Sequence, residues 1–284
     1  MTPENATLYV IATPIGNLED MTARAIEILG QVDLIAAEDT RHSKPLLDHF
    51  GIDTALRAYH DFSTGSAIAA LVAELQAGRS LALISDAGTP LISDPGYSLV
   101  KAVREAGFDV IPVPGASALT AALSVAGIAT DRFCFEGFLP ARTGSRKNRL
   151  ALLQAEQRTL VFYESPHRIK DSISDFAAVF GADRRIFVGR ELTKKFETHF
   201  HGSLDDCLHW LAADNNQQRG EFVLVVSGCS NDELEADRLK AALDWVERLR
   251  AEMSTRKAVS LASEITGARK NSLYDAVLKA GQQK

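Results

Sequence analysis

Short apolar runs alternate with amphipathic segments through the first part of the chain. The runs with the length and composition of buried strands lie at 8–13, 32–37, 56–59, 80–85 and 110–113. Between the third and the fourth run, Ile68, Leu71, Val72 and Leu75 recur at the spacing that places side chains on one face of a helix. Strands that alternate with helices indicate a parallel α/β sheet, which we expect to form an N-terminal domain at residues 1–117.

The pattern changes in the second part of the chain. Further strand-like runs lie at 132–138, 159–163, 186–190 and 222–227, with another at 196–201. Helical segments do not separate every pair of these runs, so we expect a mixed sheet in a second α/β domain at 118–230. A polar stretch at 228–233 then leads to a helical domain at 233–284, with breaks at 253–254 and at Gly267. Its last two helices resemble a helix-turn-helix arrangement.

Composition narrows the class of protein. The chain has 284 residues, of which 46% are hydrophobic and 24% charged, as in ordinary soluble globular proteins. No apolar run approaches the ~18 residues of a membrane helix, and no basic region opens the chain as in a secretory signal. Cys134, Cys207 and Cys229 are far apart, and the spacings typical of metal sites do not occur. We expect a cytoplasmic protein with reduced cysteines, no bound metal and no membrane partner.

Glycine and proline gather directly after three of the predicted strands. Residues 85–96 read SDAGTPLISDPG, while TPIGN at 13–17 and PGASA at 114–118 follow the first and the fifth strand. Ordinary turns explain any one of these stretches. Because the carboxyl ends of parallel strands meet at one sheet edge, all three together indicate a ligand cleft. Neither a dinucleotide-binding glycine motif nor a phosphate-binding P-loop is present.

Five long stretches together resemble one family. They are TPIGNLEDMTARA (13–25), AAEDTRHS (36–43), SDAGTPLISDPG (85–96), FYESPHR (162–168) and RELTKKFE (190–197). The chain is similar to the ribosomal RNA small-subunit methyltransferase I family, within the tetrapyrrole-methylase-like (class III) S-adenosyl-L-methionine-dependent methyltransferases. The resemblance implies an α/β fold of two domains with the methyl donor bound in the cleft between them, and a short C-terminal helical domain. It also implies a homodimer that methylates the ribose 2′-oxygen of a cytidine in the decoding region of 16S rRNA.

The resemblance also assigns residues to the donor site. The implied donor contacts are Pro14, Ile15, Gly16, Asn17, Asp86, Ala87, Gly88, Thr89, Pro90, Gly115, Ala116, Ser117 and Ala118, with Leu192, Gly220 and Glu221 from the second domain. In the family a Pro or Cys is common in the middle of the fifth-strand loop, where this chain reads PGASA. We expect Asp86 to bind the ammonium or a ribose hydroxyl of the donor. By contrast, Ser93 or Asp94 reads as a helix N-cap, with Pro95 at the first helical position.

Methyl transfer to a weakly nucleophilic hydroxyl benefits from a base or a cation near the acceptor oxygen. The candidates for these roles are Glu38, Asp39, Arg41, His42, Glu164 and Lys194. The first four follow the second strand, at the same sheet edge as the donor loops, and we favour them over Glu164. The alternatives are a local hydrogen bond for His42 and a surface ion pair between Arg41 and Asp39.

Positive charge indicates two RNA-binding segments. Residues 1–115 hold 15 acidic and 7 basic residues, so the basic surface must come from the rest of the chain. The candidate RNA contacts are Arg142, Arg146, Lys147 and Arg149 in the second domain, and Arg256, Lys257, Arg269 and Lys270 in the helical domain. Solvated helix surfaces, or a small packing domain in the second case, are the competing interpretations. The partner that we expect is 16S rRNA within the small ribosomal subunit.

Two other functions remain open at this point. One is a class III methyltransferase that acts on a tetrapyrrole or another non-RNA acceptor, such as a modified side chain of a translation factor. The net charge of −6 suits such an acceptor better than RNA. The other is a donor-binding regulator without methyl transfer, which grips nucleic acid through the helical domain.

Overall fold

The first domain is a parallel sheet with helices on both faces. The computed structural model describes residues 6–60 and 65–281; residues 1–5, on which the expected absence of a signal segment depends, lie outside that part. The strands are β1 (Thr7–Ile11), β2 (Leu34–Ala37), β3 (Leu56–Ala58), β4 (Leu81–Ile84) and β5 (Asp109–Val113). Their order is β3-β2-β4-β1-β5, and every pair is parallel.

Two hydrophobic cores explain why these strands are apolar throughout. In β4, Ala82 and Ile84 pack under α1 (Ala23–Gln31) and α2 (Thr40–His49). Leu81 and Leu83 face the opposite way and pack under α3 (Gly65–Gln76) and α4 (Tyr97–Glu105). A short 3-10 helix, η1 (Leu18–Asp20), precedes α1. The loops after the strands therefore all emerge at one edge of a sheet that is covered on both sides.

The second domain is a mixed sheet. Its strands are β6 (Phe133–Phe138), β7 (Thr159–Glu164), β8 (Arg185–Arg190), β9 (Thr198–Ser203) and β10 (Phe222–Val226), in the order β6-β7-β10-β8-β9. Only β6 and β7 pair in parallel, and the other neighbours are antiparallel. On one face lie α6 (Thr143–Leu153), α7 (Ile169–Phe180) and α8 (Leu204–Ala213), and the 3-10 helix η2 (Asn215–Gln218) follows α8.

The other face of this sheet joins the two domains. Helix α5 (Ala118–Val125) lies across it, with Leu119 and Leu123 against Val161 and Val223. Ile15, from the loop after β1, is part of the same buried cluster. The chain thus passes from one sheet to the other between β5 and α5, and a continuous apolar contact holds first-domain loops against the second sheet.

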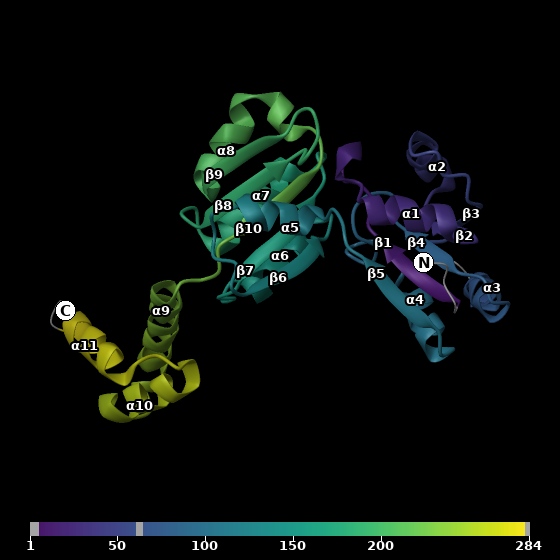
Figure 1. Ribbon diagram of the computed structural model, residues 1–284. Helices are drawn as coiled ribbons and strands as arrows, with labels where there is room; N and C mark the ends of the chain where they lie inside the picture. The colour runs from purple at the N-terminus through teal and green to yellow at the C-terminus, as the bar shows by residue number, and fades with distance from the viewer. Residues whose placement is uncertain (1–5, 61–64, 282–284) are drawn as a thin grey trace.

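Three helices complete the chain: α9 (Asn231–Leu249), α10 (Thr255–Thr266) and α11 (Lys270–Gly281). They have a core of their own, which includes Val246, Val259 and Leu273. Gly267 ends α10 in the left-handed conformation that glycine adopts most readily, with φ of 72°. Figure 1 shows these helices extending from the second domain, on the side away from the first.

The strands predicted from the sequence form in the structure, but the predicted start of α4 does not. Each predicted strand forms, with ends within about two residues of the expected ones, and the parallel and mixed sheets are confirmed. The predicted helix start at Ser93 or Asp94 is wrong. Helix α4 begins at Tyr97 after Gly96, whose φ is 142° and which makes no side-chain cap bond. No helix among residues 6–60 and 65–281 is long and apolar enough to cross a membrane.

Candidate functional site

The loop at 85–96 connects the loops that follow the neighbouring strands. Gly88 exchanges two backbone hydrogen bonds with Thr13, of 2.9 and 3.0 Å, which join the loop to the end of β1. The hydroxyl of Thr89 donates to the carbonyl oxygen of Ala116 at 3.0 Å, which joins it to the loop after β5. Gly88 has a φ of 83°, and a Cβ there would press against Ile15 at 3.2 Å. Glycine and the threonine hydroxyl are therefore used to pack three loops into one wall.

Asp86 extends this connection to the loop after β2. Its carboxylate accepts a hydrogen bond of 3.1 Å from the backbone N–H of Asp39. Asp39 in turn is the N-cap of α2 and forms an ion pair of 2.8 Å with Arg41. The hydrogen bonds and charge of Arg41 lower the pKa of Asp39 to about 2. Asp86 thus holds the 36–43 loop in place, and Asp39 is committed to local contacts.

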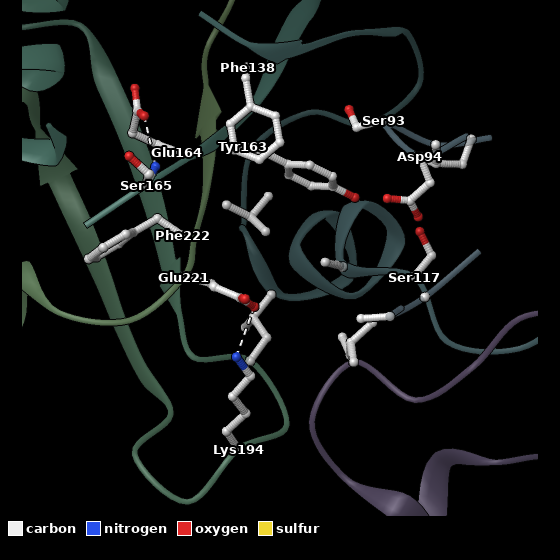
Figure 2. Close-up of a pocket in the computed structure, with 18 of the residues that line it drawn as sticks. Ser93, Asp94, Ser117, Phe138, Tyr163, Glu164, Ser165, Lys194, Glu221 and Phe222 are labelled. Atoms are coloured by element: carbon white, nitrogen blue, oxygen red, sulfur yellow. Dashed lines mark hydrogen bonds and ion pairs between the residues drawn. The ribbon is translucent and has the colours of Figure 1, made fainter. Parts of the chain in front are cut away.

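A cavity of about 420 Å³ lies between this wall and the second sheet. From the first domain it is lined by the 87–94 segment and Ile15, and from the second by side chains of β7 and β10 and of the 189–194 segment. Figure 2 shows Asp94, Ser117 and Tyr163 facing one another at one end, and Lys194 with Glu221 at the other. A second cavity of about 520 Å³ shares four lining residues with it, namely Ile15, Ala87, Lys194 and Glu221.

Most of the residues assigned to the donor site line one of the two cavities. Those on the first are Ile15, Ala87, Gly88, Thr89, Ser117, Ala118, Leu192 and Glu221. Pro14, Gly16 and Asp86 line the second. The structure therefore brings together loops that are up to about 200 residues apart in the sequence, as the strand-end argument predicts.

The remaining assigned residues shape the loops and do not line either cavity. The side chain of Asn17 caps η1 by accepting from the N–H of Glu19. Gly115 leaves room for Ala12, whose Cβ would lie 3.0 Å from a Cβ on residue 115. Ala116 accepts the Thr89 bond, Pro90 is buried, and Gly220 has a φ of 92° beside the side chain of Glu191. We assign these residues no direct contact with a ligand.

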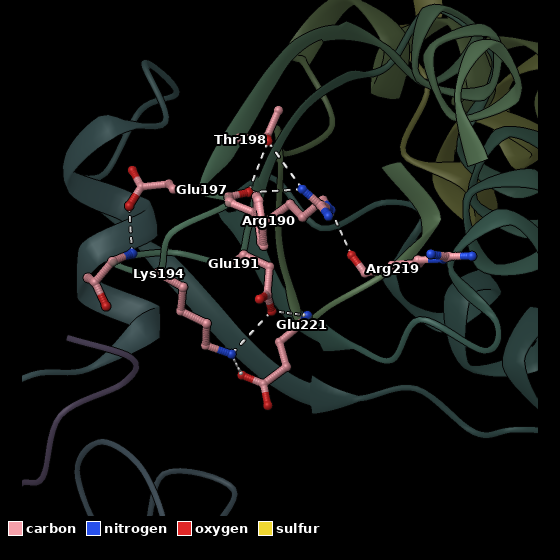
Figure 3. A network of polar contacts seen from close by, with 9 residues as sticks. Arg190, Glu191, Lys194, Glu197, Thr198, Arg219 and Glu221 are labelled. Atoms are coloured by element: carbon pink, nitrogen blue, oxygen red, sulfur yellow. Dashed lines mark hydrogen bonds and ion pairs between the residues drawn. The ribbon is translucent and has the colours of Figure 1, made fainter. Parts of the chain in front are cut away.

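The 190–197 segment closes the cavities from the second domain and is held by a polar network (Figure 3). The amine of Lys194 donates to Glu221 at 2.8 Å and to Glu191 at 3.1 Å. The Arg190 guanidinium bonds the carbonyl oxygens of Arg219 and Phe196. Burial alone would lower the pKa of Lys194, but the bonds to the two carboxylates outweigh it, and the pKa is raised.

Backbone strain is concentrated in two loops that border the cavities. Among the described residues, the non-glycine positions with positive φ are Leu91 (73°), Ser93 (66°), Glu191 (52°) and Thr193 (65°). Such conformations cost of the order of 1 kcal/mol or more each and persist where the surrounding structure enforces them. Leu91 and Ser93 belong to the 85–96 loop, whereas Glu191 and Thr193 belong to the 190–197 loop. Both loops are therefore held in defined shapes at the boundary between the domains.

The sequence pattern does not show that Asp94 lies at the cavity. It is half-buried and lines the first cavity instead of capping α4. Burial raises the pKa of Asp94 to about 6; the negative charges of Glu38 and Asp86 add to this effect, and the Ser85 hydroxyl opposes it. The phenol of Tyr163 accepts a hydrogen bond from the N–H of Leu119, and burial raises its pKa as well. The DPG letters fit a helix start, so the sequence carried no signal that separates the two interpretations.

The residues that we expect to act in catalysis differ in how far their side chains are already engaged in hydrogen bonds. Glu164 is buried, and its carboxylate accepts from Arg168 at 2.6 Å, from Ser172 at 2.6 Å and from the N–H of Ser165. Glu164 lines the first cavity, but these three hydrogen bonds inside the second domain occupy its carboxylate, and its catalytic role stays a prediction. Lys194, Arg41 and His42 line the second cavity.

The basic residues that we expect to contact RNA differ in their exposure. Arg146 is only 1% exposed, and its guanidinium bonds Asp175 at 2.7 Å and the carbonyl oxygen of Ala141. The expected RNA contact of Arg146 is therefore wrong, because the charge is consumed inside the domain. Arg142 and Lys147 are exposed, with the Lys147 amine 3.5 Å from Asp175.

The other basic side chains lie on the surface with differing partners. Arg149 pairs with Glu136, and Arg269 pairs with Glu235 at 3.2 Å. Arg256 and Lys270 line a groove on α10 and α11, while Lys257 is exposed. No group of three or more His, Cys, Asp or Glu side chains that could hold a metal ion occurs in the described part of the chain. Cys134, Cys207 and Cys229 carry free thiols.

Known protein families and solved structures resemble this chain. Residues 7–207 match the family Tetrapyrrole (Corrin/Porphyrin) Methylases, and residues 232–281 match the RsmI C-terminal HTH domain. Among solved structures, a diphthine synthase aligns with a TM-score of 0.61 at 12% identity, over 78% of this chain and 90% of that one. Uroporphyrin-III-C-methyltransferase from Thermus thermophilus aligns with a TM-score of 0.56 at 18% identity, over 78% and 94%. At such identities these structures support the fold alone.

Curated relatives are much more similar. The ribosomal RNA small subunit methyltransferase I of Pseudomonas aeruginosa is 51% identical over 273 residues, which cover 96% of this chain and 97% of that protein. The protein of the same name from Escherichia coli O157:H7 is 50% identical over 96% of this chain and 94% of its own length. Both α/β domains and the helical domain are included in these matches. The chain therefore belongs to the ribosomal RNA small subunit methyltransferase I family, within the tetrapyrrole methylases.

Proposed function

We propose that this protein transfers the methyl group of S-adenosyl-L-methionine to the ribose 2′-oxygen of a cytidine in the decoding region of 16S rRNA. The observation that carries the proposal is the cavity between the domains, lined by the loops at the carboxyl ends of the first-domain strands. The relatives that share about half of its residues over nearly the whole chain are named as small-subunit rRNA methyltransferases, which supports an RNA acceptor over a tetrapyrrole.

The residues of the cavity fit such a donor. Its volume of about 420 Å³ lies within the range of small-molecule sites. Apolar side chains, including Ile15 and Leu192, and the closely packed Gly88 backbone suit a flat heterocycle and a ribose. The carboxylate of Glu221 suits the positive charge of an ammonium group. When bound, the donor supplies an electrophilic methyl group.

A side chain at the cavity can accept the proton of the acceptor hydroxyl. A ribose hydroxyl is a weak nucleophile, so a group that accepts its proton speeds the reaction. We assign this role to Asp94, which faces the cavity beside Tyr163 while Glu164 is committed elsewhere (Figure 2). The loops bordering the cavity also exclude water and fix the position of both reactants.

The proposed reaction also has a defined substrate, compartment and oligomeric state. The substrate is 16S rRNA within the small ribosomal subunit, and the enzyme acts in the cytoplasm as a homodimer. Contact with RNA phosphates is assigned to the exposed side chains of Arg142 and Lys147, and to Arg256 and Lys270 in the helical domain. Light scattering of the purified protein measures the oligomeric state: twice the mass of 30.8 kDa is expected.

The experiment that tests the proposal is methyl transfer from labelled donor to 30S subunits taken from a strain that lacks this gene. Mass spectrometry of the RNA then locates the product. A single 2′-O-methylated cytidine in the decoding region of 16S rRNA is the expected result. Donor binding without incorporation into 30S subunits would reject an RNA acceptor, and incorporation into a tetrapyrrole offered in parallel would establish the alternative.

A further inference from the structure

Strand β6 ends in an irregularity that changes the direction of one aromatic side chain. Phe135 pairs with Val161, but the next paired residue is Gly137 with Phe162, so Glu136 is the extra residue of a β-bulge. Gly137 has a φ of 64°, and a Cβ there would lie 3.1 Å from the Ser93 hydroxyl oxygen. The bulge therefore needs glycine and brings the end of β6 directly against the 85–96 loop.

The bulge decides which face of the sheet Phe138 occupies. Phe138 is in register with Tyr163, whose side chain belongs to the cluster between the domains. In an uninterrupted strand the register would move by one residue, and Phe138 would pair with Glu164 and point to the opposite face. The side chain of Phe138 thus lies at the cavity because of a single inserted residue.

Phe138 and Tyr163 form a partly open aromatic surface. Their ring centroids are 5.7 Å apart at an interplanar angle of 66°, and Phe135 supports Tyr163 from 4.9 Å. Tyr163 is fixed by the N–H of Leu119 at its phenol oxygen. Phe138 is 53% exposed, and it is the one exposed large apolar side chain of the described residues that lines the first cavity. The exposed face of this ring is therefore available to a ligand in the cavity.

The surroundings of this surface favour a nucleotide as its occupant. The carboxylate of Asp94 lies on the same side of the cavity as the Tyr163 phenol (Figure 2). The exposed Arg142 follows Phe138 after three residues, and no acidic residue occurs from 137 to 155. Aromatic faces beside cationic side chains are the usual receptors for unstacked bases of single-stranded RNA.

We infer that Phe138, supported by Tyr163, is the stacking platform for the base of the nucleotide whose ribose is methylated. The inference rests on the proposed function and adds the subsite in which the acceptor binds. The base leaves its stack in the RNA and packs on the Phe138 ring, which carries its ribose toward Asp94. Because any base has a flat face, the platform positions the nucleotide and does not by itself select cytosine.

The test compares three variants: Phe138→Ala, Phe138→Trp and Phe133→Ala. Phe133 is the matched control, because it is an exposed phenylalanine on the same strand and face as Phe138 that lies outside the cavity. For each protein, calorimetry gives the Kd for the donor, and initial rates give kcat/KM for 30S subunits. We expect Phe138→Ala to lower kcat/KM about tenfold or more with donor Kd unchanged within twofold. Phe138→Trp should keep at least half of the rate.

The outcomes separate the platform from the proposed function. Wild-type protein that binds the donor but does not methylate 30S subunits would reject the function, and the platform with it. Active wild-type protein with an equally active Phe138→Ala variant would overturn the platform alone. A loss of donor affinity in Phe138→Ala would also overturn it, because Phe138 would then be a wall of the donor site. Loss of activity in Phe133→Ala would show that the effect is not local.

Discussion

The side chain of Lys194 in the second domain packs so closely on Gly16 in the first that a Cβ at position 16 would overlap Lys194 Cγ. The amine at the end of the same side chain is held by Glu191 and Glu221. Contact across the domain boundary is therefore made by a side chain whose two ends are both fixed. The pair sets how closely the loop after β1 approaches the second domain, at the point that the two cavities share.

The first prediction follows from this contact. Gly16→Ala should weaken donor binding about tenfold, because the new methyl group pushes the 190–197 loop away from the first domain. Lys194→Ala removes the overlapping Cγ, so adding Gly16→Ala to it should cost less than half as much as in the wild type. A double-mutant cycle on the donor Kd, measured by calorimetry, tests the coupling. Additive effects would show that the two residues act separately.

Asp86 allows charge and hydrogen bonding to be separated. In Asp86→Asn the amide oxygen still accepts the bond from the N–H of Asp39, whereas Asp86→Ala loses it. If Asp86 binds the donor through its charge, both variants weaken donor binding more than tenfold. If it only anchors the 36–43 loop, Asn retains the affinity and Ala lowers it. Donor Kd values with melting temperatures decide. We expect the former, because Asp86 lines the second cavity and its neighbour Ala87 lines both.

Asp94 gives a pH-dependent prediction for stability. Burial raises its pKa in the folded state to about 6, above the ordinary 3.8. The folded protein then holds the proton more tightly than the unfolded chain, so this group makes the protein less stable as pH rises from about 4 to 6. Asp94→Asn should remove that dependence and raise the free energy of unfolding at pH 7 by up to about 2–3 kcal/mol. Urea unfolding at pH 4.5 and 7 measures it.

The same residue gives a prediction for the rate. A carboxylate that accepts the proton of the acceptor hydroxyl must be ionised, so kcat should fall as pH drops through about 6. Asp94→Asn should lower kcat at least about a hundredfold with donor affinity retained. The measurement is single-turnover methyl transfer to 30S subunits between pH 5 and 8. A variant with full activity and the wild-type pH profile would remove Asp94 from the mechanism.

The sequence predicted the sheets and the loops that border the cavities well, because both depend on local pattern. Apolar runs have the strand period, and the turn residues at 13–17, 85–96 and 114–118 lie at strand ends whatever the tertiary details. Asp94 and Arg146 were misjudged because burial and tertiary packing decide where their side chains lie. Asp175, which binds Arg146, is 29 residues away in the sequence.

Phe138 shows a further limit. The strand pattern places it in β6 correctly, but alternation alone assigns it to the wrong face. The decisive feature is the bulge, and Gly137 is its only trace in the sequence. An isolated glycine in a strand indicates a bulge or a close backbone approach, so this signal was available without the structure, although it does not tell where the next side chain points.

Arg146 and Arg142 form a matched pair for a further prediction. Arg146→Ala leaves Asp175 buried beside a Lys147 amine that is 3.5 Å away, and it should lower the free energy of unfolding by about 3 kcal/mol. Arg142→Ala should change stability by less than about 0.5 kcal/mol but weaken 30S binding. Urea unfolding and filter binding measure the two quantities. Equal stability of both variants would contradict the structural role of Arg146.

The helical domain supplies the last prediction. Arg256 and Lys270 line one groove on α10 and α11, whereas Arg269 is paired with Glu235. Arg256→Ala combined with Lys270→Ala should weaken binding to 30S subunits about tenfold and leave donor Kd unchanged. Arg269→Ala is the control, with a smaller expected effect. If the groove binds phosphates, each lost contact lowers the slope of log affinity against log salt by about 1, so the double variant loses about 2. An unchanged slope would mean that these helices pack against protein and not against RNA.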